Sequence, residues 1–130
     1  MVLEVDKEMV NSVVIICEDG PFGKDSIIES LRMAAGLLAV GDIEECKVIL
    51  LRDAIYFLNK NLKPEVLKMD DFENIKRLME LSELEIFVHD NALENAGMKS
   101  SDLILRDNVN IVDIRKISQL ISEANVSFKY

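Results

Sequence analysis

The chain has 130 residues, of which 49% are hydrophobic and 30% charged, and its formal net charge is −9. This composition is typical of one globular domain with its own core, so we expect a single domain over 1–130 with a loosely ordered lead-in over 1–11. The acidic balance argues against nucleic acid and anionic membrane as partners, because clustered Lys and Arg recognise both. No apolar run reaches the ~20 residues that span a bilayer. No leader pattern opens the chain, so we expect a cytoplasmic protein.

Apolar runs and helical patterns alternate along the chain. An unbroken apolar run over 13–17 predicts a strand that is covered on both faces. A turn signal over 20–23 ends it, and Ser26 and Glu29 have the spacing of a capping box at a helix start. The further expected elements, in order, are a helix over 26–40, a strand over 47–51, a short helix over 54–59, a helix beginning after Asp70 or Asp71, a strand over 85–88, a short helix over 91–96, a strand over 109–112, a helix after Asp113 and a strand over 126–128.

This alternation predicts an α/β fold, an open parallel five-stranded sheet with helices on both faces. Right-handed crossovers and a reversal after the second strand favour the strand order 2-1-3-4-5. Ligands of such sheets bind beyond the carboxyl ends of the strands. The first and third strands would be neighbours in this order. We therefore expect a binding site at their ends, formed by Glu18, Asp19, Gly20, Gly23, Asp90 and Asn91.

The loop Gly20-Pro-Phe-Gly23-Lys24 invites comparison with phosphate-binding loops. The phosphate loop requires G-x-x-x-x-G-K-[ST], but Glu18 occupies the first glycine position and Asp25 follows the lysine. The carboxylates beside the loop would also repel a phosphate. A plain turn is therefore favoured over a nucleotide site.

Two residues are candidates for a catalytic role, Cys17 and His89. Two cysteines are too few for a disulfide framework and make no metal-ligand pattern, so neither a metal nor a cofactor is expected. Cys17 ends a strand beside two carboxylates, which disfavour the thiolate, so a small buried hydrophobe is the favoured interpretation. His89 is the only histidine and follows a buried strand at the expected binding edge. Proton transfer, partner contact and a structural hydrogen bond all remain open for it.

The order of these elements resembles the DsrE/DsrF-like family, which includes subunits of the Tus sulfur relay. The resemblance extends from Val13 to Phe128 and depends on the first strand, its Gly-Pro-Phe-Gly loop, the Ala-rich first helix and Ile86-Phe-Val-His-Asp-Asn-Ala-Leu-Glu-Asn-Ala-Gly-Met98. In the catalytic branch of the family a cysteine ends the third strand and carries sulfur as a persulfide. Counting back from Gly97, that position falls on His89, and no residue from 89 to 97 is a cysteine.

The resemblance therefore implies a subunit of a sulfur-relay system that is non-catalytic or atypical, since an imidazole cannot hold a sulfane sulfur as a thiolate does. It would act by assembling with other DsrE/DsrF-like subunits, and a sulfur-carrier protein is a possible further partner. Two alternatives stay open. One is a small-molecule or nucleotide-binding module that uses the cleft at the strand ends. The other is a sulfurtransferase that uses Cys17.

An oligomer is expected on two grounds. The family resemblance implies a homo-oligomer or a hetero-oligomer. The segment after the second strand is also rich in large apolar side chains that a short helix at a sheet edge would not easily bury. Such side chains form exposed patches at interfaces. The expected interface residues are Ile55, Tyr56, Phe57 and Leu58.

Overall fold

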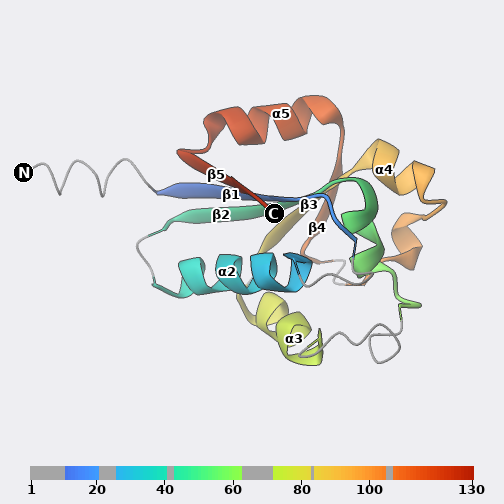
Figure 1. The fold of residues 1–130 in the computed structure, drawn as a ribbon, viewed down its shortest axis with the longest axis horizontal. Coiled ribbons are helices and arrows are strands. Elements are labelled where there is room, and N and C mark those ends of the chain that lie inside the picture. Colours follow the sequence, from blue (N-terminus) through green and yellow to red (C-terminus); the bar gives the residue numbers. More distant parts are fainter. Residues whose placement is uncertain (1–10, 21–25, 41–42, 63–71, 83, 105–106) are drawn as a thin grey trace, which may run out of the picture.

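The computed structural model describes residues 11–20, 26–40, 43–62, 72–82, 84–104 and 107–130. These residues form a single parallel sheet with helices on both faces (Figure 1). The elements, in chain order, are β1 (Ser12–Cys17), α2 (Ser26–Val40), β2 (Glu45–Leu50), the 3-10 helix η1 (Arg52–Leu58), α3 (Phe72–Ser82), β3 (Glu85–His89), α4 (Asp90–Asn95), the 3-10 helix η2 (Ser100–Asp102), β4 (Val109–Val112), α5 (Ile114–Glu123) and β5 (Val126–Lys129).

All five strands are parallel, as predicted, but the predicted strand order is wrong. The order is β4-β3-β2-β1-β5, so β2 rather than β1 lies at the centre. Val48, Ile49 and Leu50 of β2 are each 0% exposed, and a strand buried on both faces is stable only between two neighbours and under two helical layers. Consequently β1 and β3 do not pair. Each instead pairs with one side of β2.

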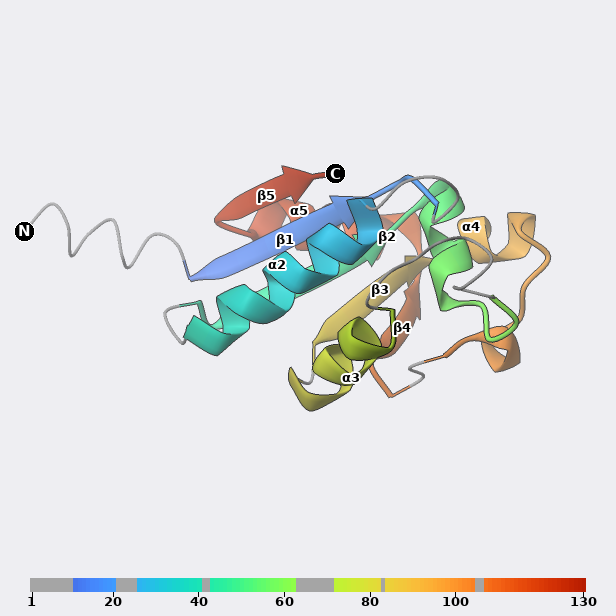
Figure 2. The ribbon, with the colours of Figure 1, turned by 60° about the horizontal axis from the view of Figure 1, so that its bottom comes forward.

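The chain moves across the sheet in one direction from β1 to β4 and returns only once, to place β5 beside β1. Right-handed crossovers then put α2 and α3 on one face and α5 on the other, as Figures 1 and 2 show. The larger part of the core lies between the sheet and α2, α3 and η1. A smaller cluster under α5 contains Val14, Ile49, Phe87, Ile117 and Leu120.

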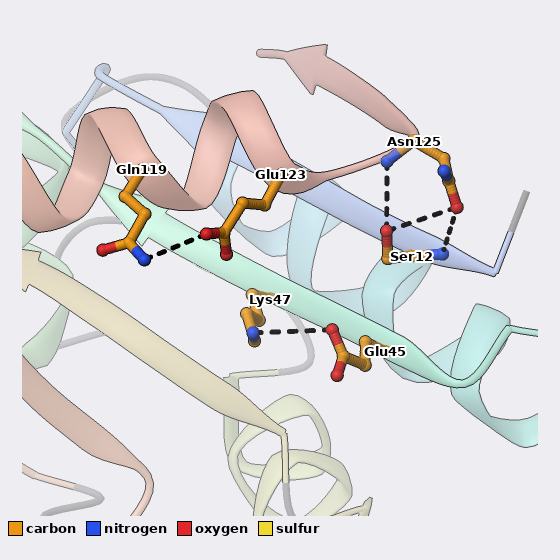
Figure 3. A network of polar contacts seen from close by, with 6 residues as sticks. All are labelled: Ser12, Glu45, Lys47, Gln119, Glu123 and Asn125. Atoms are coloured by element: carbon orange, nitrogen blue, oxygen red, sulfur yellow. Dashed lines mark hydrogen bonds and ion pairs between the residues drawn. The ribbon is translucent and has the colours of Figure 1, made fainter.

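Polar contacts at the amino end of the sheet hold the returning strand in place (Figure 3). The side-chain oxygen of Asn125, just before β5, accepts hydrogen bonds from the backbone N–H groups of Asn11 (3.0 Å) and Ser12 (3.2 Å). The Asn125 N–H donates in return to the Ser12 hydroxyl at 3.0 Å. These bonds join residues 113 and 114 positions apart and fix the register of β5 against β1.

Most predicted element bounds agree with the structure within about two residues. One stop signal and one start signal act as expected: Gly97 after α4 has a positive φ of 70°, and the Asp113 carboxylate accepts a hydrogen bond from the Lys116 N–H at 2.9 Å at the start of α5. The expected helix caps at Asp70 or Asp71 lie outside the described residues. The side chain of Ser26, and with it the expected capping box, also lies outside them.

The expected exposed interface on η1 is wrong for three of its four residues. Ile55, Phe57 and Leu58 are each 0% exposed and belong to the main core, and only Tyr56 is half-buried. The 3-10 form explains this burial, because residues i and i+3, here Ile55 and Leu58, project from the same side of the helix. Helix α4 packs against η1 and helps to cover it.

Phe57→Ala tests this placement. Truncation of a fully buried phenylalanine should lower the free energy of unfolding by about 3–5 kcal/mol. The matched control is Phe128→Ala on the edge strand β5, where the ring is 41% exposed and the loss should be well below 2 kcal/mol, a rough estimate from partial burial. Chemical denaturation of the purified variants measures both. Equal losses would contradict the assignment of Phe57 to the core.

Candidate functional site

A pocket of about 470 Å³ opens at the carboxyl edge of the sheet. Its lining comes from the ends of the three adjacent strands β1, β2 and β3 and from η1, α4 and the start of α5. The lining residues are Glu18, Leu51, Arg52, Asp53, Tyr56, His89, Ala92, Asn95, Ala96 and Ile114. This is the edge at which parallel α/β sheets bind ligands, and the volume lies in the range of small-molecule sites.

The structure brings together only some of the residues predicted for the site. Glu18 and His89 line the same pocket, although β2 separates their strands, and the end of β2 lies between them. Asp90 and Asn91 begin α4 beside the pocket without belonging to its lining. Asp19 and Gly20 follow Glu18 and are partly buried, again outside the lining. Gly23 lies outside the described residues.

Gly20 has a steric role in building the pocket. A Cβ atom at this position would lie 2.8 Å from the carbonyl oxygen of Asp53, which is closer than two such atoms can approach. Only glycine therefore allows the loop after β1 to rest directly on the first turn of η1. This contact, together with the hydrogen bond from the Ala54 N–H to the Glu18 carbonyl at 3.2 Å, joins two walls of the pocket.

His89 ends β3 and caps α4 with its backbone. Its side chain is 20% exposed, and its Nε2 atom is buried with no hydrogen-bond partner among the described residues. Oδ1 of Asp90 is 3.7 Å from Nε2. That distance suits an ion pair with a protonated imidazole but exceeds hydrogen-bond length. An unsatisfied buried polar atom costs about 1–3 kcal/mol, so this imidazole is not held as a structural hydrogen-bonding group.

Arg52 is the pocket residue that the sequence did not indicate. It begins η1, it is exposed, and its φ of 49° is the only positive value among the described non-glycine residues. No ion pair or hydrogen bond engages its guanidinium within the described part of the chain. The one available signal was its position directly after a buried strand, where the ends of parallel strands gather. The left-handed backbone gave no signal, because that conformation is typical of Gly and Asn rather than Arg.

Glu18 has its own partner. Its carboxylate lies 3.5 Å from the Lys129 ammonium on β5, and the Tyr130 N–H donates to the Ile16 carbonyl at 2.8 Å, so the last residues hold the end of β1. The negative charge of Glu18 is thereby largely compensated at the pocket wall.

Both thiols of the chain lie away from the pocket lining. Cys17 is 1% exposed and faces α2, where its Sγ lies 2.8 Å from the hydroxyl of Ser30. Burial raises the pKa of Cys17 to about 11, the negative charge of Asp19 acts in the same direction, and the Ser30 contact opposes them. Burial also raises the pKa of Cys46 to about 11. At neutral pH both groups are therefore protonated thiols, which are poor nucleophiles and poor metal ligands.

Arg52→Gly tests whether the backbone at the pocket is strained. Glycine adopts a positive φ freely, whereas an L-residue pays about 1–2 kcal/mol there, so the variant should be more stable by roughly 0.5–1 kcal/mol. The control, Arg77→Gly in the middle of α3, should be less stable by about 1 kcal/mol because glycine disfavours a helix interior. Thermal and urea unfolding measure both. A destabilised Arg52→Gly variant would show that the side chain supports the fold.

Three solved structures share this fold over nearly the whole chain. The ychN protein from E. coli has 20% sequence identity and a TM-score of 0.76, with 93% of this chain and 100% of that chain covered. Protein BT1422 from Bacteroides thetaiotaomicron has 13% identity, a TM-score of 0.64 and coverage of 92% and 95%. Protein MTH1491 from Methanobacterium thermoautotrophicum has 14% identity, a TM-score of 0.58 and coverage of 92% and 98%. At these identities the likeness shows the fold alone.

No curated protein matches the sequence. The family model of the DsrE/DsrF-like family does match it, over residues 11–129. That span includes every strand of the sheet and every residue of the pocket. The chain belongs to the DsrE/DsrF-like family.

Proposed function

We propose that this chain is a non-catalytic subunit of a sulfur-relay system, one that carries no persulfide on its own thiols. The observation that supports this most directly is the imidazole of His89 at the end of β3, in the wall of the pocket. A persulfide carrier needs a thiolate at its reactive position, and an imidazole does not supply one.

The two thiols of the chain do not replace the missing one. Cys17 and Cys46 are both buried, 1% and 4% exposed, and neither lines the pocket. Their raised pKa values leave almost no thiolate at neutral pH. The alternative of a sulfurtransferase that uses Cys17 is therefore disfavoured on access as well as on ionisation.

The subunit would act by assembly, with its pocket edge available to a partner. Large apolar side chains outside η1 are exposed on both faces and at one edge of the sheet: Leu78 and Leu81 on α3 are 40% and 76% exposed, and Ile111 on β4 and Ile114 on α5 are 41% and 53% exposed. Exposed apolar side chains of this size are common at interfaces. We therefore retain assembly with other family subunits, on these residues rather than on η1. No helix within the described residues is long and apolar enough to cross a membrane.

Mass spectrometry of the folded protein after incubation with cysteine persulfide tests the thiol argument. The wild-type chain should keep its own mass, because both thiols are buried and protonated. The control Ser118→Cys places a thiol on an exposed position of α5 and should gain one sulfur atom, which shows that the reagent is active. His89→Cys should also gain one sulfur. A sulfur adduct on Cys17 or Cys46 of the folded wild type would overturn the proposal.

Sedimentation at micromolar concentration tests assembly. The protein should sediment as a species heavier than the 14.7 kDa chain, or as part of a heavier complex in native extracts. Leu81→Lys should shift the protein toward the single chain without unfolding it, because that side chain is 76% exposed. The control Lys99→Leu changes a different exposed position and should not weaken assembly. A single 14.7 kDa species with no partner in extracts contradicts the proposal.

A further inference from the structure

We infer that the pocket at the carboxyl edge binds a small organic monoanion, with Arg52 contacting its acid group. This inference concerns the chain by itself and does not depend on the relay role. Three features of the pocket support it: the charges of the lining, its apolar side chains and the positive φ of Arg52.

The charges of the pocket leave one cation available. Glu18 is compensated by Lys129 at 3.5 Å, whereas the Arg52 guanidinium has no ion pair or hydrogen bond among the described residues. The chain has 24 acidic residues against 15 basic ones, so an unpaired guanidinium in a pocket is notable. A guanidinium binds a planar acid group through two parallel hydrogen bonds.

The second carboxylate of the pocket restricts the charge of the ligand. Asp53 follows Arg52 in the lining, is exposed, and forms no ion pair with a described residue. A dianion such as a phosphate would meet repulsion from Asp53, the lining carboxylate that no ion pair among the described residues compensates. A monoanion needs only the single positive charge that Arg52 supplies. The pocket therefore favours a carboxylate over a phosphate.

The rest of the wall is suited to an apolar body. Four lining side chains contribute hydrocarbon surface: Leu51 just after β2, Ala92 on α4, Ala96 at its C-cap, and Ile114 on α5, which is 53% exposed. The volume of about 470 Å³ accommodates a ligand larger than acetate. Apolar surface beside a small number of polar and charged groups is the usual composition of a small-molecule site.

The backbone supports a binding role for Arg52. Its φ of 49° costs energy that a glycine would avoid, and strain of this kind persists at ligand-binding positions where the side chain is needed. Replacement by glycine would release the strain and remove the proposed anion contact together. Stability and binding should therefore change in opposite directions in Arg52→Gly.

NMR titration of the full chain with benzoate tests the inference. Benzoate should cause saturable shifts of the pocket amides. Benzamide, which has the same shape without the charge, and acetate, which has the charge without the ring, should each bind at least about tenfold more weakly. Inorganic phosphate should not bind more tightly than benzoate. 4-Methylpentanoate serves as a second, aliphatic monoanion.

Arg52→Gln should weaken benzoate binding about tenfold or more while the amide spectrum shows an intact fold. The matched control is Arg77→Gln on α3, which removes an exposed guanidinium outside the pocket lining and should leave the affinity unchanged. Three results overturn the inference: equal affinity for benzoate and benzamide, unchanged affinity in Arg52→Gln, or no saturable shift with either monoanion.

Discussion

The pairing of β2 with β1 on one side and β3 on the other determines which residues meet at the carboxyl edge of the sheet. The register aligns Ile15 with Val48 and Val48 with Ile86 across the three strands, all of them 0% exposed. Because parallel strands in register end at the same edge, the residues that follow them meet there. Glu18, Leu51 and His89 become three neighbouring points of one wall, and the pocket follows from that alignment.

The same pairing decides what the pocket contains. With β2 at the centre, Leu51 and Arg52 follow it into the pocket lining, which also includes Glu18 and His89 from the ends of the two neighbouring strands. Cys17 lies on β1 but faces the helical layer of α2, so its thiol is directed into the core. The site thus holds a cation, an imidazole and an apolar wall, and it lacks a thiol. These groups recognise anions and transfer protons, whereas persulfide transfer requires a thiolate.

Much of the fold could be predicted from the sequence because its signals are local. The apolar runs of the strands, the turn residues and the Asp113 cap each act over a few residues, and the helix over 26–40 was predicted with the observed bounds. Strand order is not local. The apolar runs over 13–17 and 47–51 both have the composition of a central strand. In the structure the first pairs with the polar edge strand β5, and the second takes the central position. The order 2-1-3-4-5 was wrong for this reason.

Part of the candidate site could also be predicted from the sequence. Glu18 and His89 follow buried strands, so their placement at the binding edge could be inferred. Arg52 could not, since a left-handed backbone and a charge left unpaired among the described residues set it apart, and neither leaves a pattern in the sequence. The apolar segment over 55–58 was predicted to be exposed but is largely buried. Its 3-10 helix packs against α4 and buries side chains that a simple edge helix would expose.

We propose that this chain contributes its pocket, and no thiol of its own, to sulfur transfer. The most direct measurement is the sulfur-transfer rate of the complex that copurifies with the chain from its native cells, compared with the same complex that contains a Cys17→Ala, Cys46→Ala chain. We expect the same rate, because neither thiol lines the pocket and both are buried. Loss of transfer in a complex that still assembles would contradict it and would assign the chemistry to one of these thiols.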